Sequence, residues 1–283
     1  MQFIKFLLAI LSLTYTAYSN EYDFKNYTVV DGLSESTINV IFEDDKGFLY
    51  IGTENGLGLF DGLAFFNYKM NVFNETTIFG NNIKSICQDD YGDIWVGTEL
   101  GLSKLNTRTR KFERIANTNY NLKDIEKIFN DKNGNIWFRN SDGIYKYQQT
   151  SNEVECISCG DNLEINSFSN IYSTYSNEIL ISTFSNLYRY DFDSDTLRSM
   201  LNSNNSTIEI SFVTDILEID NTLWIGSKNG LIQLPYDPEL KPQIYKEKTS
   251  SLVNDDIRDI EYSKKKNEIW ISTKNGISIL NLS

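Results

Sequence analysis

The stretch Tyr91–Asn106 reads YGDIWVGTELGLSKLN and contains three signals in a fixed order. A turn with an acidic residue and a glycine comes first, then a tryptophan between two β-branched residues, then Gly-Thr followed by Gly-Leu. Aromatic and β-branched residues favour strands, whereas glycine permits the positive φ angles of tight hairpins. The stretch therefore predicts two short antiparallel strands joined by a hairpin turn.

The same pattern recurs along the chain in six copies. Its aromatic position advances by 45, 42, 43, 44 and 46 residues, and all four tryptophans of the sequence occupy it. The six copies are Tyr50–Leu57, Trp95–Leu102, Trp137–Ile144, Leu180–Leu187, Trp224–Leu231 and Trp270–Ile277. This regularity indicates one structural unit that stacks on copies of itself.

A pair of β-branched residues precedes a polar turn in five copies, and in the first three copies that turn is acidic and contains a glycine. The pairs are Ile38/Ile41, Ile83/Ile86, Ile125/Ile128, Val213/Ile216 and Ile257/Ile260. Their three-residue spacing is compatible with a helix, but the segments are short and rich in β-branched residues, which favours strands. Two further short strands follow each Gly-Leu, so each unit has four strands, as in a β-propeller blade. We therefore predict an all-β fold, a β-propeller of four-stranded blades, with each tryptophan at an interface between blades.

Two arrangements of the six repeats remain open. The last repeat ends after its third strand, while residues 22–30 precede the first repeat and resemble Ala64–Tyr68, its fourth strand. An N-terminal strand that completed the last blade would close a six-bladed ring and remove two exposed sheet edges. In the alternative, the chain is a truncated seven-bladed propeller and forms an open arc.

Composition excludes several functional classes. The 283 residues carry a net charge of -13, which argues against nucleic acid as a partner. The chain has no histidine, which removes Ser-His-Asp and Cys-His catalysis and every histidine-ligated metal site. Carboxylates are abundant, but nothing in the sequence pairs two of them as in a glycosidase. We therefore expect no enzymatic activity, no cofactor and no metal.

Two short motifs suggest chemistry and have simpler explanations. Cys156 and Cys159 form a C-x-x-C motif, but a redox or zinc site requires a βαβ context or a second ligand pair. A local disulfide or two free thiols is expected there, and Cys87 is expected to be a buried apolar residue. Asp131–Asn135 begins like a calcium-binding loop, but Asp142 stands where a bidentate glutamate is required. We interpret it as a hairpin turn.

Polar residues occupy the loops that gather on one face of a propeller, between second and third strands and between blades. They are Ser34, Ser36, Glu54, Asn55, Asn81, Asn82, Glu99, Asn140, Asp142, Asn186, Lys228, Asn229, Lys274 and Asn275. Such a ring could bind a sugar or a peptide, although solvated turns need the same residue types. If it binds a ligand, replacing Glu99 and Asn140 should remove binding and leave the stability of the free protein nearly unchanged.

Ile-x-x-Ile, the acidic turn, Trp-Ile/Val-Gly-Thr and Gly-Leu together resemble the two-component regulator propeller repeat. The likeness covers about residues 24–281, and Asp31–Ser34 resembles the start of such a region. In that family the repeats build the periplasmic sensor region of hybrid two-component systems of gut Bacteroidetes.

The resemblance implies an exported module that senses a saccharide or another polar ligand. Its partners would then be an oligosaccharide or similar polar ligand and a membrane-bound histidine kinase portion or a further propeller. The sequence shows neither a kinase nor a membrane span of its own. The alternative is therefore a free-standing secreted propeller that binds glycan or protein as a scaffold.

The first residues resemble a secretory signal peptide. Lys5 precedes the apolar run Phe6–Thr14, which is too short to span a membrane, and Ala17–Ser19 supplies small residues for cleavage. The domains are therefore a signal peptide over residues 1–19 and a periplasmic or secreted β-propeller over residues 20–283. We predict that the mature protein from its native host begins at or near Asn20, which an intact mass would check. A cytoplasmic protein that still begins at Met1 would contradict export.

Overall fold

Six antiparallel sheets follow one another along the chain in this computed structural model. It describes residues 25–116, 119–159, 170–200, 210–237 and 240–282, so the predicted signal peptide lies outside the described residues. Five sheets have four strands and the last has three, and each sheet follows chain order. The predicted all-β propeller architecture is therefore confirmed, and we number the sheets as blades 1 to 6.

The strands of blades 1 to 3 are β1 (Ile38–Glu43), β2 (Leu49–Thr53), β3 (Gly56–Phe60), β4 (Phe65–Tyr68), β5 (Ile83–Gln88), β6 (Ile94–Thr98), β7 (Leu102–Asn106), β8 (Lys111–Ile115), β9 (Lys127–Asn130), β10 (Asn135–Asn140), β11 (Gly143–Gln148) and β12 (Glu153–Cys159). Those of blades 4 to 6 are β13 (Asn170–Ser173), β14 (Ile179–Ser182), β15 (Leu187–Asp191), β16 (Thr196–Ser199), β17 (Val213–Ile219), β18 (Thr222–Ser227), β19 (Gly230–Pro235), β20 (Gln243–Tyr245), β21 (Ile257–Ser263), β22 (Glu268–Thr273) and β23 (Gly276–Asn281). The described part also contains the short 3-10 helix η1 (Val29–Asp31), and none of its helices is long and apolar enough to cross a membrane.

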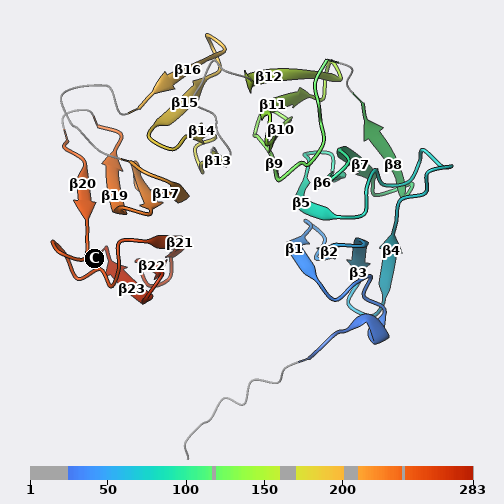
Figure 1. Cartoon of the computed structure of the whole chain (residues 1–283), viewed down its shortest axis with the longest axis horizontal. Coiled ribbons are helices and arrows are strands. Elements are labelled where there is room, and N and C mark those ends of the chain that lie inside the picture. Colours follow the sequence, from blue (N-terminus) through green and yellow to red (C-terminus); the bar gives the residue numbers. More distant parts are fainter. Residues whose placement is uncertain (1–24, 117–118, 160–169, 201–209, 238–239, 283) are drawn as a thin grey trace, which may run out of the picture.

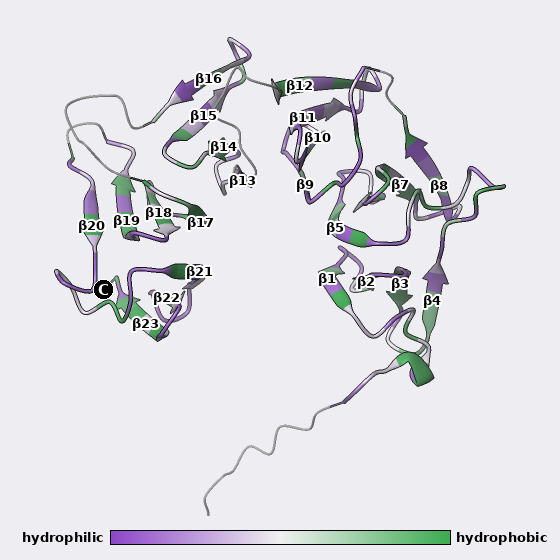
Figure 2. Cartoon of the chain, viewed as in Figure 1, coloured by the Kyte–Doolittle hydropathy of each residue, from purple (hydrophilic) through white to green (hydrophobic). Residues whose placement is uncertain are grey.

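The blades surround a central space, with the first strand of each blade innermost (Figure 1). An opening in the ring separates blade 1 from blade 6 in the same view. Hydropathy follows this layout, because β3 and β17 are largely hydrophobic whereas the outer strand β8 is largely hydrophilic (Figure 2). The apolar surface therefore lies mainly between blades, where neighbouring sheets cover one another.

A β-bulge explains the Ile-x-x-Ile spacing of the inner strands. In β1, β5, β17 and β21 the pairing register shifts directly after the first apolar residue of the pair. Residues three apart point to opposite faces of a regular strand, but the extra residue of a bulge turns them to the same face. Ile83 and Ile86 therefore both pack towards the preceding blade, in one cluster with Tyr50 and Leu57.

The glycine of Gly-Thr makes room for the first isoleucine of the next blade. A Cβ atom at Gly52 would lie 2.6 Å from Cγ2 of Ile83, and one at Gly97 would lie 2.6 Å from Cγ2 of Ile125. Both separations are far below van der Waals contact, so a larger residue would push the blades apart. In blades 1 and 2 the glycine of the second strand thus lets the first isoleucine of the next blade pack closely against it.

The tryptophans of blades 2 and 3 join the blade interface to the acidic turn of their own blade. The indole N–H of Trp95 donates to Asp89 over 2.8 Å, and that of Trp137 donates to Asp131 over 2.8 Å. The Asp131 carboxylate also accepts the backbone N–H of Asn135 over 2.8 Å. Asp131 therefore organises a hairpin turn and anchors the buried indole ring.

Blades 1 and 6 each expose a face that is buried in the other blades. Ile38 and Ile41 are 40% and 63% exposed, whereas their equivalents Ile83 and Ile86 are 0% and 6% exposed. Trp270 of blade 6 is 37% exposed, while the three other tryptophans are buried. Within the described residues, no blade covers either of these two faces.

The segment before blade 1 packs on that blade. The Tyr27 ring packs 4.9 Å from Phe60 and 5.6 Å from Phe65, both of blade 1. The Thr28 backbone N–H donates to Asp31 over 2.8 Å, which stabilises η1. Aromatic contacts and this capping interaction thus hold residues 25–31 on blade 1. Residues 25–30 are not paired with blade 6 in this structure, and which of the two predicted closures holds stays a prediction.

Because burial differs between two equivalent tryptophans, their replacement should have unequal costs. We predict that Trp224→Ala lowers the free energy of unfolding by about 3–5 kcal/mol, whereas Trp270→Ala lowers it by about 1 kcal/mol or less. Urea denaturation of the two variants measures both values. Equal losses would show that the Trp270 face is covered in solution.

Candidate functional site

The predicted ligand residues lie in turns that meet on one face of the propeller. The turn between β2 and β3 contacts the connection to blade 2, because the Gly56 N–H donates to the Asn81 carbonyl over 2.7 Å. The turn between β18 and β19 contacts the next connection in the same way, through Gly230 N–H and the Asp255 carbonyl at 3.0 Å. The two kinds of loop named by the sequence are therefore neighbours.

The threonine of Gly-Thr closes the hairpin beneath this face. The hydroxyls of Thr53, Ser227 and Thr273 each donate over 2.8 Å to the carbonyl of the glycine three residues later. The Thr53 hydroxyl also lies 3.0 Å from the hydroxyl of Ser34, one of the predicted ligand residues. The hairpin framework therefore uses Ser34.

Glu99 has a structural role. Its carboxylate accepts the backbone N–H of Asn81 over 3.0 Å and that of Asn82 over 2.9 Å. Charge-assisted bonds to two successive N–H groups hold the connection between blades 1 and 2 against the turn of blade 2. The Glu99 carboxylate is thus bonded to the backbone of two other predicted ligand residues, Asn81 and Asn82.

Asn140 is also fully engaged and is only 3% exposed. Its amide donates to the carbonyls of Asn121 and Lys123 over 2.7 and 3.0 Å. Its oxygen accepts the N–H groups of Asp142 and Gly143 over 2.9 and 3.1 Å. Because removing a buried group with four hydrogen bonds leaves partners unsatisfied, the expectation that Asn140 is dispensable for stability has no support in the structure.

Five more of the predicted residues have partners in nearby turns. The pairs are Ser36 with Glu35, Asp142 with Asn121, Asn186 with Ser199, Lys228 with the ring of Phe212, and Asn229 with Lys246. These contacts satisfy the side chains at least in part. They leave less polar capacity for a ligand than the sequence alone indicates.

Four predicted residues keep exposed side chains without a hydrogen bond or ion pair to any other described residue: Glu54, Asn55, Lys274 and Asn275. Glu54 and Asn55 lie in the β2–β3 turn of blade 1, and Lys274 and Asn275 lie in the β22–β23 turn of blade 6. The free polar groups thus lie on the two blades that flank the opening in Figure 1.

The sequence analysis missed two partly buried charges on the inner strands. Burial raises the pKa of Asp215 to about 6, and the Asp259 carboxylate also raises it. Burial lowers the pKa of Lys127, whose Nζ lies 4.4 Å from the centre of the Tyr172 ring. Both residues occupy the third position of the Ile-x-x-Ile type of motif, and a charge at that position was the available signal.

The cysteines agree with the expectation of a local disulfide and a buried apolar thiol. Cys156 is disulfide-bonded, and Cys87 is a free, buried thiol whose pKa is raised by burial. The side chain of Cys159 lies outside the described residues. In the described ranges no group of three or more Cys, Asp or Glu side chains is arranged to hold a metal ion.

Comparison with known families agrees with the repeat pattern. Residues 32–55 and 77–99 match the model of the two component regulator propeller. A histidine kinase of Formosa agariphila is 38% identical over 72 residues, which are 25% of this chain and 5% of the kinase. The chain therefore carries two-component regulator propeller repeats and corresponds to a small part of that relative.

Solved structures share the fold at low sequence identity. PorZ, a surface component of the type IX secretion system of Porphyromonas gingivalis, superposes with a TM-score of 0.66 at 15% identity over 86% of this chain and 38% of its own. The extracellular domain of a putative hybrid two-component system of Bacteroides thetaiotaomicron gives 0.55 at 18% identity over 86% and 38%. Virginiamycin B lyase of Staphylococcus aureus gives 0.63 at 11% identity over 94% and 86%. These likenesses show the propeller fold.

Asn140 is bonded to its neighbours whereas the Asn275 side chain has no such partner among the described residues, so their replacement should change the free energy of unfolding by different amounts. We predict that Asn140→Ala lowers the free energy of unfolding by about 2–3 kcal/mol, because four hydrogen bonds are lost in a buried site. Asn275→Ala, on an exposed turn, should change it by less than about 0.5 kcal/mol. Urea midpoints of both variants test this, and an unchanged midpoint for Asn140→Ala would refute the structural role.

Proposed function

We propose that this chain is an exported, ligand-sensing β-propeller module of the kind found in the extracellular sensors of hybrid two-component systems. Its ligand is a saccharide or another polar molecule, and the kinase portion is a separate domain or protein. The observation that carries this proposal is the match of blades 1 and 2 to the two component regulator propeller. The similarity of 72 residues of the chain to a histidine kinase supports it.

The proposed ligand face is centred on the turns of the first and last blades. Glu54 supplies an anionic acceptor, Lys274 a cationic donor, and Asn55 and Asn275 supply amides that both donate and accept. Hydroxyl-rich ligands are bound by such mixed groups, which fix orientation through several directional hydrogen bonds. Glu99 and Asn140 hold the connections that lead to blades 2 and 3 and are not themselves ligand contacts in this proposal.

The proposed role is binding and not catalysis. One structural neighbour is a lyase, of which a catalytically inactive variant carries alanine in place of a histidine. This chain contains no histidine, so it cannot supply a group of that type. The described residues also present no cluster of metal-binding side chains that could replace it.

A secreted scaffold that binds glycan or protein is the second candidate. The observation in its favour is the pair of exposed apolar faces at the ends of the array, which include Ile41 and Trp270. Contiguous exposed apolar side chains mark sites of protein–protein contact. This candidate predicts a protein partner at the ends of the array.

A thermal-shift screen of oligosaccharides tests the sensing proposal. A ligand that binds the folded state should raise the melting temperature, with a stabilisation that grows as the logarithm of the ligand concentration divided by Kd. The double variant Glu54→Ala with Lys274→Ala should lose the shift and keep the melting temperature of the free protein. Lys111→Ala, an exposed change on the outer strand β8, serves as the control and should retain the shift.

The outcomes separate the proposals. A shift that persists in the double variant would show that the ligand binds elsewhere. If no polar ligand raises the melting temperature, the sensing proposal fails. Capture of a defined partner protein that is abolished by Trp270→Ala would then favour the scaffold.

A further inference from the structure

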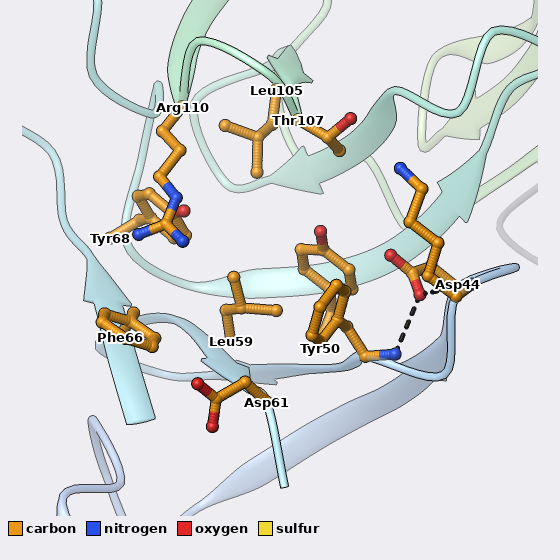
Figure 3. Close-up of a pocket in the computed structure, with 11 residues that line it drawn as sticks. Asp44, Tyr50, Leu59, Asp61, Phe66, Tyr68, Leu105, Thr107 and Arg110 are labelled. Carbon is orange, nitrogen blue, oxygen red and sulfur yellow. Dashed lines mark hydrogen bonds between the residues drawn. The ribbon is translucent and has the colours of Figure 1, made fainter. Parts of the chain in front are cut away.

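A pocket lies between blades 1 and 2, on the face opposite the turns discussed above (Figure 3). Its volume is about 140 Å³. The buried side chains of Tyr50, Leu59 and Leu105 form its floor, and the exposed Phe66 and Arg110 stand at its rim. An engineered apolar cavity of about 150 Å³ binds benzene, so this space is large enough for a six-membered ring.

The pocket exists because blade 1 departs from the repeat. In blade 2 the equivalent of Tyr50 is Trp95, whose indole bonds Asp89. The residue paired with Trp95 is Lys104, whose Nζ lies 5.3 Å from the centre of the indole ring and 3.0 Å from Asp89. A large ring and a lysine therefore fill the corresponding space between blades 2 and 3.

Blade 1 replaces both of these groups with smaller ones. Tyr50 takes the place of the tryptophan, and Leu59, which pairs with it, takes the place of the lysine. Asp44 still accepts the N–H groups of Lys46 and Phe48 over 3.0 and 2.9 Å, so the turn is retained. Only the filling of the interface is lost, which leaves the hollow.

Three hydrogen-bond donors face this hollow without a partner among the described residues. Figure 3 shows the hydroxyl of Tyr50 and the guanidinium of Arg110 directed into the same space, beside Tyr68. The structure records no hydrogen bond or ion pair for these three side-chain polar groups. Burial raises the pKa of Tyr50 and of Tyr68 above the ordinary value, so both hydroxyls remain neutral donors.

Arg110 occupies a backbone position that folding alone does not favour. Its φ is 57°, in the left-handed region, at the hairpin between the third and fourth strands of blade 2. The same hairpin position carries Asn152 in blade 3 and Asp195 in blade 4, with φ of 58° and 54°. Asparagine and aspartate tolerate this region better than arginine, so arginine is retained at a conformational cost. Its guanidinium lies 5.0 Å from the centre of the Phe66 ring, at the mouth of the pocket.

The acidic side chains at the pocket are already engaged in turns. Asp61 accepts the N–H groups of Leu63 and Ala64 over 2.9 and 2.8 Å. The bond from Ala64 is the main cause that holds the pKa of Asp61 below its ordinary value. Asp61 therefore stays ionised without forming an ion pair with Arg110. Asp61 and Asp44 each keep one carboxylate oxygen that can accept a ligand hydroxyl.

We propose that this pocket binds a ring-sized organic carboxylate. The carboxylate is held by the Arg110 guanidinium and the hydroxyls of Tyr50 and Tyr68, and the ring packs on Phe66 and Leu59. Arginine recognises carboxylates through paired, charge-assisted hydrogen bonds, and phenol hydroxyls add neutral donors. Both an aromatic acid and an acidic sugar have this chemistry. The site is independent of the proposed function on the opposite face.

Isothermal titration of the whole chain with benzoate and glucuronate tests the proposal, with benzyl alcohol and glucose as matched neutral probes. At least one acid should bind, and its neutral analogue should bind at least about tenfold more weakly, since the charge-assisted bonds are lost. Binding of benzoate alone would identify an aromatic acid, and binding of glucuronate alone an acidic sugar. Failure of both acids to bind, or equal binding of the neutral probes, would overturn the proposal.

Two variants and two controls locate the site. Arg110→Asn should abolish binding and keep or raise the melting temperature, because asparagine suits the left-handed position. Tyr50→Trp should abolish binding by filling the hollow. Arg108→Asn removes the same charge from the same hairpin and should bind normally. The double change Glu54→Ala with Lys274→Ala should also bind normally, so failure here and failure of the sensing proposal are distinguishable. Unchanged binding in Arg110→Asn would refute the site.

Discussion

The contact between an isoleucine of one blade and a glycine of the preceding blade determines how closely the sheets approach. A Cβ atom at Gly52 would lie 2.6 Å from Cγ2 of Ile83, and one at Gly97 would lie 2.6 Å from Cγ2 of Ile125. Neither glycine can therefore be replaced by alanine without moving the neighbouring blade. In blade 2 the bulge of β5 turns Ile83 towards Gly52. The bonds of the tryptophan and of the hairpin threonine, such as Trp95 to Asp89 and Thr53 to Gly56, lie within one blade, so the contact between isoleucine and glycine sets the separation of blades that are already shaped.

The propeller architecture could be predicted from the sequence because the same pattern of residues recurs in six copies. Two repeated signals carry this prediction: the aromatic position that contains Trp95 and Trp137, and the glycine of the hairpin turn that follows it. Both depend on local spacing and on burial alone. The segment around Tyr27 could not be assigned in this way, because its resemblance to the fourth strand of blade 1 did not reveal that it packs on that blade. Its position depends on one aromatic cluster and one capping interaction, which have no repeated copies to compare.

The candidate site was harder to predict for a physical reason. Turn residues are polar whether they hold the backbone or face solvent, so composition cannot separate Asn140 from Asn275. Only the hydrogen-bond partners divide them, and these partners come from connections about 20 residues away in the sequence. Deviations from the repeat are more informative than the repeat itself. Tyr50 and Arg110 each differ from their counterparts in other blades, and the two differences meet at one pocket.

The uncovered faces of blades 1 and 6 have a consequence for motion. In a stacked array each inner unit is held by two interfaces and each terminal unit by one, so local opening requires the least free energy at the ends. The free turns of Glu54 and Lys274 belong to those two terminal units. A molecule that bound there would order the segments that fluctuate most. Ligand binding would then change the rigidity of the blades, even if the average position of every strand stayed the same.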